Sequence, residues 1–293
     1  MRRSMLFLPG NTPRFINNAD VLGADSVILD LEDAVSPEQK DTARLMVRNA
    51  LHYKNFHGVE VIVRVNPISS GMWQADLDEI VPFKPSLIMP TKVDSAEYVK
   101  KISDYIGKVE QKNNIKEGTV KMIPLIETAM GIENAFAIAT ADPRVKALFI
   151  GCEDLTSDLH SIRTKESAEV YYYRCRIVCA ARAAGIDVYD TPFTDFNDDE
   201  GLRKDAMLAK GLGFTGKACI SPRQVDIVNE VFSPTEAEIE YAKQVFQVMA
   251  EAKASGRGAV ALKGKMIDKP IVDRAARVLE VAKALGKYGE TNE

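Results

Sequence analysis

The chain has 293 residues, and 46% of them are hydrophobic, which is enough for a large buried core. Its formal net charge is −4 and its pI is near 5.6, a balance that argues against a surface that binds nucleic acid or an anionic membrane. No stretch approaches the length of a transmembrane helix, and Pro9 and Gly10 cut the first apolar run too short for a signal peptide. We therefore expect a cytoplasmic protein, and the presence of only four cysteines agrees with a reducing compartment.

Eight short apolar runs follow one another along the chain, and amphipathic helical stretches separate most of them. In order, the runs are Ser4–Gly10, Ser26–Asp33, Glu60–Asn66, Ser86–Lys92, Met122–Thr128, Ala147–Asp154, Asp187–Phe193 and Gly216–Pro222. A strand–helix alternation of this kind predicts an α/β fold, a (β/α)8 TIM barrel over residues 1–232.

Two local patterns place helices between these strands. The sequence Ser36-Pro37-Glu38-Gln39 predicts a capping box, with Ser36 as the N-cap and proline at the first helical position. An apolar stripe predicts a second helix, which lies on the barrel and ends at Gly185; its members are Val170, Tyr173, Ile177, Ala181 and Ala184.

Residues 233–293 extend beyond the eighth strand as a C-terminal helical extension. We expect one helix from Ser233-Pro234-Thr235-Glu236 to about Ser255-Gly256, a weakly strand-like link over 257–267, and a last helix from Pro270 to about Leu285. A segment of this size is too small to fold alone. It must pack on its own barrel or on a neighbouring subunit, or cover the active site as a lid.

Charged residues gather where the predicted strands end, and the C-terminal strand ends of such barrels carry the catalytic groups. These residues are Glu32, Asp33, Arg64, Lys92, Glu127, Glu153 and Asp154. Glu127 ends the fifth strand and Asp154 the sixth, so their carboxylates can meet over the barrel mouth and bind Mg²⁺. The alternative for each single acid is a solvated side chain at the start of a loop.

Arg64 lies in the otherwise apolar run VIVRVN, so we expect it to point into the barrel mouth. A buried guanidinium needs an anion, and a substrate carboxylate or enolate oxygen fits its two directed donors. A salt bridge to Glu32 or Glu127 is the alternative. Arg14, which follows the first strand, is either a ligand of a substrate carboxylate or a surface charge.

Two lysines keep a different chemistry open. Lys92 ends the fourth strand and Lys217 opens the eighth, and a desolvated lysine at either place could form a Schiff base with a keto substrate. Zinc chemistry and a histidine-centred triad are not expected, because none of the three histidines ends a predicted strand. Core packing is the better interpretation for the cysteines, of which Cys152 and Cys219 fall within strand runs.

Eight segments in fixed order resemble one protein family over nearly the whole chain. They are RRSMLFLPGNTPRF, DSVILDLEDAV, VIVRVN, IMPTK, PLIETAMGI, IGCEDL, GKACISPRQVDIVNEVFSPT and GKMIDKP. The resemblance is to the β subunit of citrate lyase and its relatives in the HpcH/HpaI aldolase–citrate lyase family, which also contains malyl-CoA and citramalyl-CoA lyases. Together the segments are specific for the family and much less so for the substrate.

The resemblance implies roles for particular residues. We expect Glu127 and Asp154 to bind Mg²⁺. Arg64 is expected to bind the reacting oxygens, with Arg14 nearby. Asp268, in GKMIDKP, matches an acid/base group that relatives place in a neighbouring subunit's active site. We assign catalytic roles to Asp268, Arg64 and Glu32 and substrate contacts to Arg14, Arg64, Lys92 and Glu127.

The resemblance also implies an activity and partners. We expect a Mg²⁺-dependent lyase that cleaves a citryl thioester, carried by CoA or by an acyl-carrier protein, into oxaloacetate and an acetyl thioester. The alternatives are a citramalyl-CoA or malyl-CoA lyase, a Schiff-base aldolase, and a non-catalytic binding subunit. A homo-oligomer, a trimer in many relatives, is expected, and acyl-carrier and transferase subunits of a citrate lyase complex are further candidate partners.

Overall fold

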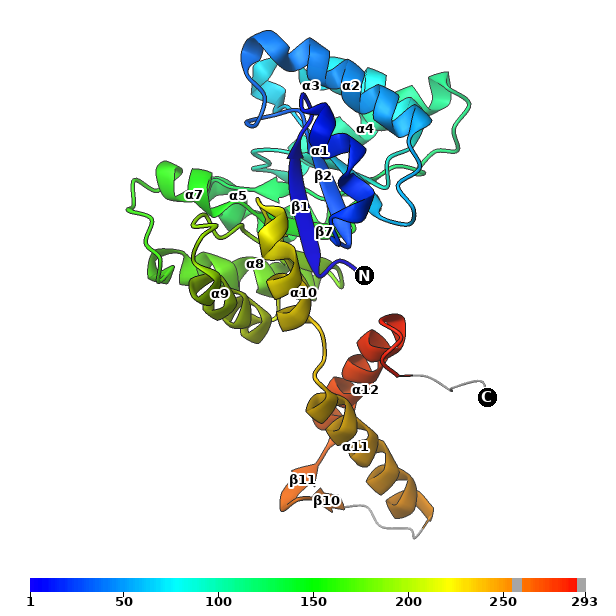
Figure 1. Ribbon diagram of the computed structural model, residues 1–293, viewed down its shortest axis with the longest axis vertical. Coiled ribbons are helices and arrows are strands. Elements are labelled where there is room, and N and C mark those ends of the chain that lie inside the picture. Colours follow the sequence, from blue (N-terminus) through cyan, green and yellow to red (C-terminus); the bar gives the residue numbers. More distant parts are fainter. Residues whose placement is uncertain (255–259, 289–293) are drawn as a thin grey trace. The chain divides into compact units, whose positions relative to one another are not determined.

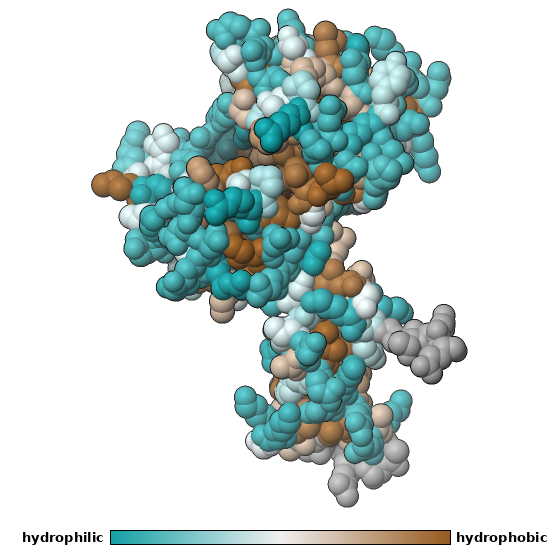
Figure 2. Space-filling model, in the orientation of Figure 1, coloured by the Kyte–Doolittle hydropathy of each residue, from teal (hydrophilic) through white to brown (hydrophobic). Residues whose placement is uncertain are grey.

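The computed structural model describes residues 1–254 and 260–288, and contacts within the chain divide it into two compact units. One unit runs from Arg2 to Phe232, and the other begins at Ser233. Throughout the described parts of the chain, every helix is too short or too polar to span a membrane. Figure 2 shows mostly hydrophilic residues on the visible face, with hydrophobic residues exposed in smaller groups between them.

The first unit is built on a parallel sheet (Figure 1). Its strands are β1 (Ser4–Pro9), β2 (Ser26–Asp30), β3 (Glu60–Val65), β4 (Leu87–Pro90), β5 (Lys121–Met122), β6 (Leu125–Ile126), β7 (Ala147–Ile150), β8 (Asp187–Asp190) and β9 (Gly216–Cys219). They are ordered β5-β4-β3-β2-β1-β9-β8-β7-β6, so the two ends of the sheet are consecutive in the chain.

The predicted fifth strand closes the barrel in two parts. β5 pairs with β4, and β6 pairs with β7, with Ile123 and Pro124 between them. Pro124 has no N–H to donate to a ladder, but its carbonyl accepts from the N–H of Phe149 at 3.0 Å. The eight predicted strands are thus confirmed, and the sheet is a (β/α)8 barrel whose fifth strand is interrupted at a proline.

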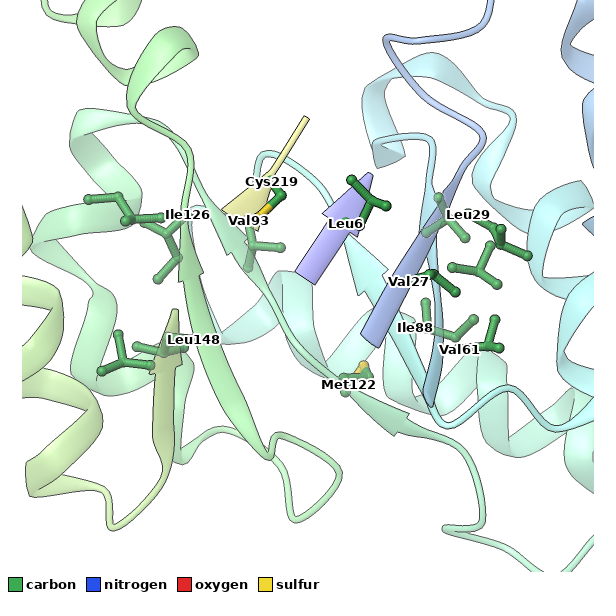
Figure 3. Close-up of a cluster of buried hydrophobic side chains, with 14 of the residues drawn as sticks. Leu6, Val27, Leu29, Val61, Ile88, Val93, Met122, Ile126, Leu148 and Cys219 are labelled. Carbon is green, nitrogen blue, oxygen red and sulfur yellow. The ribbon is translucent and has the colours of Figure 1, made fainter. Parts of the chain in front are cut away.

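Alternate residues of each strand face opposite sides of the sheet and pack into two separate cores. Met5, Ile28 and Ile62 belong to the cluster that fills the barrel centre. Leu6 and Val27 belong to the larger cluster between the sheet and the helices, part of which is shown in Figure 3. Burial on both faces explains why the strands read as continuous apolar runs.

Helices follow the strands and cover the outside of the barrel. They are α1 (Pro13–Asn17), α2 (Lys40–Tyr53), α3 (Trp73–Ile80), α4 (Ala96–Lys112), α5 (Ala129–Glu133), α6 (Ala135–Thr140), α7 (Cys152–Asp158), α8 (Tyr171–Ala183), α9 (Asp199–Leu212) and α10 (Val225–Phe232). Several neighbouring helices lie side by side, as α2 and α3 or α9 and α10 do in Figure 1. The helix predicted to end at Gly185 is α8.

The predicted capping box at Ser36 is wrong. The Ser36 side chain makes no cap hydrogen bond, and a 3₁₀ turn over Pro37–Gln39 precedes α2. The side-chain oxygen of Gln39, which the box requires, instead accepts a hydrogen bond from Asn11. A capping box does form at Ser221 and Gln224, directly before α10.

The second unit contains α11 (Glu236–Ala254), β10 (Val260–Leu262), β11 (Lys265–Ile267) and α12 (Lys269–Ala284). Thr235 starts α11 with a reciprocal cap: its hydroxyl accepts from the N–H of Glu238 at 3.1 Å, and Glu238 accepts from the N–H of Thr235 at 2.8 Å. β10 and β11 form an antiparallel hairpin where a weakly strand-like link was predicted. The predicted helix end at Ser255-Gly256 lies outside the described residues.

Candidate active site

A cavity of about 230 Å³ opens at the carboxyl ends of the barrel strands. Charged and apolar residues line it, from the ends of β1, β2, β3 and β6–β9 and the segments that follow. The charged members are Asp30, Asp33, Arg64, Glu127, Glu153 and Asp154, and the apolar ones include Phe7, Leu125, Phe149, Pro192 and Ile220. The structure therefore brings most of the predicted site residues together.

Arg64 is held by Asp30, its direct neighbour in the register between β2 and β3. The Asp30 carboxylate accepts from Nε at 2.7 Å and also from Nη2, while Nη1 lies 3.2 Å from Glu32 Oε2. The guanidinium carbon lies 4.9 Å from the centre of the Phe7 ring. Burial alone would lower the pKa of Arg64, but the hydrogen bonds to Asp30 outweigh it and raise the pKa. Of the two predicted salt bridges, only the one to Glu32 forms.

β2 ends at Asp30, three residues before the end of the predicted run Ser26–Asp33. The Asp30 carboxylate accepts from the N–H groups of Glu32 at 2.8 Å and Ala34 at 3.1 Å, which turns the chain immediately. Lys40 completes the turn by donating to the carbonyl oxygens of Leu31 and Glu32 at 2.8 and 2.6 Å. Glu32 therefore lies in a turn after the strand, where it does not line the cavity itself but contacts Arg64, which does.

Lys92 contacts three acids at once. Its Nζ lies 3.0 Å from Glu32 Oε1 and 3.3 Å from Asp154 Oδ2, and its backbone N–H donates to Glu127 Oε1 at 2.9 Å. The backbone adopts the left-handed region (φ 54°), which non-glycine residues visit rarely and mainly at special sites. Burial alone would lower the pKa of Lys92, but the hydrogen bond and charge of Glu32 raise it.

Neither lysine meets the requirement of the Schiff-base alternative, an uncharged amine facing the cavity. The pKa of Lys92 is raised, not lowered. Lys217 is fully buried, and its Nζ contacts Asp190 Oδ2 at 2.6 Å, Asp205 Oδ2 at 2.5 Å and the Thr191 carbonyl at 2.7 Å. An ammonium bonded in this way has no free electron pair for a substrate.

Glu127 follows β6 and is only 4% exposed. Burial raises its pKa to about 8, and the charges of Asp154 and Glu32 act in the same direction. Gly151 makes room for its carboxylate, because a Cβ at that position would lie 2.7 Å from Glu127 Oε2. The two predicted metal ligands thus line one cavity, and the charge of Asp154 helps to raise the pKa of Glu127.

Asp154 reaches the cavity from a helix and not from a strand end. β7 ends at Ile150, and α7 begins at Cys152, directly after Gly151. The prediction that Cys152 lies within a strand is therefore wrong, whereas Cys219 does belong to β9. Both thiols are buried, which raises the pKa of each to about 12.

The donor set at Glu127 and Asp154 fits Mg²⁺. Carboxylate oxygens are the ligands that this hard cation prefers, and it usually takes only one or two of them while keeping several waters. In the described residues no three His, Cys, Asp or Glu side chains form a metal-binding group, so a site supplied wholly by the chain is not indicated. Burial raises the pKa of Glu127, and a nearby cation would stabilise the ionised form of its carboxylate.

Besides Glu32 and Lys92, Arg14 and Asp268 are also absent from the lining of the cavity. Arg14 is an exposed residue of α1 and does not line the cavity. Asp268 belongs to the second unit, where it caps α12 by accepting from the N–H of Ile271 at 3.2 Å. Their predicted roles stay predictions.

Asp30 and Gly151 are absent from the predicted site, although both shape it. Asp30 could have been found from the register of two neighbouring strands, which sets it beside Arg64. Nothing in the sequence around Gly151 signals that a glutamate 24 positions earlier occupies the space of its missing side chain.

Comparisons with known proteins show which family the chain is similar to. The family model described as HpcH/HpaI aldolase/citrate lyase matches residues 3–222. Citrate lyase subunit beta of Haemophilus influenzae is 40% identical over 97% of this chain and 98% of its own, and mitochondrial citramalyl-CoA lyase of Rattus norvegicus is 32% identical over 97% and 87%.

Among solved structures, the fold matches protein CitE from Mycobacterium tuberculosis in complex with magnesium, acetoacetate and coenzyme A. The TM-score is 0.78 and the identity 30%, over 96% of this chain and 98% of that one. The match to the family model covers every strand of the barrel, and the two curated relatives are matched over 98% and 87% of their own length. The chain therefore belongs to the HpcH/HpaI aldolase/citrate lyase family.

Proposed function

We propose that the protein is a Mg²⁺-dependent carbon–carbon lyase that cleaves a citryl thioester into oxaloacetate and an acetyl thioester. The observation that carries this proposal is the acidic cavity in which Glu127, Asp154 and Arg64 meet. The citrate lyase β subunits among the relatives support citryl as the acyl group, and the magnesium in the CitE complex supports the cation.

The chemistry needs a cation, an anion-binding group and a base. Glu127 and Asp154 would hold Mg²⁺, which supplies Lewis-acid stabilisation of negative charge on the substrate oxygens. Arg64 lines the cavity with its guanidinium fixed by Asp30, so it can orient a substrate carboxylate and offset negative charge at the reacting oxygens. Glu32 holds Arg64 and Lys92 in place through one carboxylate.

Bond cleavage follows from deprotonation of the substrate. A base removes the proton of the tertiary hydroxyl, whose oxygen becomes the ketone of oxaloacetate as the C–C bond breaks. The electron pair of that bond passes to the acetyl thioester as an enolate, which is then protonated. We assign the acid/base role to Asp268 of a neighbouring subunit, which makes a homo-oligomer, a trimer in the simplest case, part of this proposal.

A second candidate is the same cleavage of a citramalyl or malyl thioester. The citramalyl-CoA lyase relative favours the citramalyl version. The coenzyme A in the CitE complex favours CoA as the carrier, while the citrate lyase β subunits favour an acyl-carrier protein with a transferase subunit. The cytoplasmic location expected from the sequence stays a prediction.

The purified protein with Mg²⁺ should therefore be assayed against citryl-, citramalyl- and malyl-CoA, with release of the keto acid as readout. We expect citryl-CoA to be the best substrate and EDTA to stop its turnover. Glu127→Ala should abolish EDTA-sensitive turnover, whereas Glu133→Ala, a control at an exposed acid of α5, should not.

Unchanged turnover by Glu127→Ala would rule out the assigned metal ligand. Binding of keto acid that depends on Mg²⁺, without turnover of any of the three thioesters, would instead identify a non-catalytic binding subunit.

A further inference from the structure

Four charged side chains form a cluster outside the cavity, which we call the buried tetrad. Arg174 comes from α8, Asp190 from β8, Asp205 from α9 and Lys217 from β9, and each side chain is at most 4% exposed. Arg174 contacts Asp190 Oδ1 at 2.9 Å and Asp205 Oδ1 at 2.8 Å, and Lys217 bridges the same two acids. The cluster contains two positive and two negative charges and is neutral overall.

Such a cluster needs an explanation. It occupies the layer between sheet and helices, where most of the buried side chains are apolar. Removing four charges from water is expensive, and well-packed hydrophobic residues are often at least as stabilising as buried ion pairs. None of the four side chains lines the cavity, so the proposed reaction does not use them directly.

One hydrogen-bonded connection leads from the tetrad to the start of α7. Lys217 Nζ donates to the carbonyl oxygen of Thr191 at 2.7 Å, and the hydroxyl of Thr191 accepts from the N–H of Cys152 at 3.1 Å. Cys152 is the first residue of α7, and Thr191 itself lines the cavity.

A second connection reaches the next residue of α7. The hydroxyl of Ser167 donates to Asp205 Oδ1 at 3.4 Å and accepts from Arg163 Nη1 at 3.0 Å. Arg163 Nε in turn donates to Glu153 Oε1 at 3.0 Å. The tetrad is thus linked to Cys152 by one route and to Glu153 by another.

Asp154 is the residue that follows these two anchored positions. Its side chain is 39% exposed, and in the described chain its only polar side-chain contact is Lys92 Nζ at 3.3 Å. Since so little holds the carboxylate directly, its position depends on where the backbone of α7 begins.

We propose that the buried tetrad is a positioning device for the metal site: through Thr191 and Arg163 it fixes the start of α7 and thereby holds Asp154 in place for a divalent cation. This inference rests on the proposed function, in which Asp154 is a Mg²⁺ ligand. It assigns a role to side chains that touch neither substrate nor metal. Groups that orient metal ligands in this way typically change metal affinity about 10–100-fold when they are altered.

The test compares two substitutions of Thr191 in the full-length protein. Thr191→Val removes the acceptor for the Cys152 N–H with little change in shape, while Thr191→Ser keeps the hydroxyl. Calorimetric titration with Mg²⁺ alone should show about 10-fold weaker binding for Thr191→Val, and Thr191→Ser should recover most of the affinity. Thr140→Val, at an exposed threonine of α6, controls for the substitution itself.

Hydrogen exchange at the Cys152 amide provides an independent readout, and Thr191→Val should deprotect it. If this amide is deprotected while Mg²⁺ binds as tightly as in the wild type, the inference is overturned and the proposed metal site stands. Equal loss of affinity in both Thr191 variants would overturn it as well. If the wild-type protein binds no Mg²⁺, the proposed function is contradicted, and this inference, which depends on it, is contradicted as well.

Arg163→Gln tests the second connection, because a positioning role and a simple charge effect of Arg163 predict opposite changes in Mg²⁺ affinity. Removing a positive charge beside an acidic cavity should by itself strengthen cation binding. If Arg163 positions α7, as we infer, the variant should bind Mg²⁺ more weakly. Tighter binding would show that Arg163 acts only as a nearby charge and would overturn its positioning role.

Discussion

Asp30 is the buried counter-ion of Arg64, and Asp30→Asn measures what their pairing contributes. The carboxylate is 1% exposed and accepts from two guanidinium nitrogens and from the N–H groups of Glu32 and Ala34. Asparagine keeps one acceptor oxygen, loses the charge and turns an NH₂ group toward these donors. Leaving one partner of a buried pair alone costs about 3–5 kcal/mol. Because Glu32 still faces Arg64 at 3.2 Å, we expect the lower end of this range.

A loss of about 3 kcal/mol should lower the Tm of a barrel of this size by roughly 6–12 °C. Thermal melts followed by circular dichroism should compare the wild type, Asp30→Asn, Arg64→Met and the double variant. The double variant no longer buries an unpaired charge, so it should melt above Asp30→Asn. If Asp30→Asn melts within about 2 °C of the wild type, or if the two substitutions are additive, the pairing does not stabilise the site as we argue.

Three further predictions concern Glu127, Gly151 and Asp268. Burial raises the pKa of Glu127 to about 8, so the folded state favours its protonated form. The free energy of unfolding of EDTA-treated protein should therefore fall by up to about 5 kcal/mol as the pH rises from about 4.5 to about 8. If thermal melts of Glu127→Gln show the same dependence of stability on pH as the wild type, this prediction is wrong. Gly151→Ala puts a Cβ 2.7 Å from Glu127 Oε2, so calorimetry should show weaker Mg²⁺ binding, and unchanged affinity would mean that the carboxylate moves aside freely. Asp268→Asn should abolish turnover but not Mg²⁺ binding, and mixing it with Glu127→Ala under subunit exchange should restore activity; mixed oligomers without activity would contradict a shared site.

The strands were predictable because their apolar runs are buried on both faces, but their exact ends were not. The runs Ser26–Asp33 and Ala147–Asp154 both overshoot the observed strands. In the first, the side chain of Asp30 turns the backbone by accepting its N–H groups. In the second, α7 starts one residue after Gly151. Acids favour helix starts as well as strand-end sites, so composition alone does not separate the two.

The cavity acids were predictable as a group, because the carboxyl ends of parallel strands meet at one end of a barrel. Their individual partners were not. Arg64 lies beside Asp30 through strand register, a relation between residues 34 positions apart. Lys92 reaches three acids from a left-handed backbone conformation that its residue type does not favour. Contacts of this kind depend on tertiary geometry, which local patterns do not encode.

The four cysteines are unpaired, and their burial divides them into two chemical classes. Cys152 and Cys219 are buried with thiol pKa values of about 12, so at neutral pH they hold almost no thiolate for an alkylating reagent. Cys175, which is half-buried, and Cys179, which is exposed, lie one turn apart on α8, and Cys175 directly follows Arg174. A thiol-reactive fluorophore or spin label should therefore attach to α8 in the unmodified protein and report on the helix that carries Arg174.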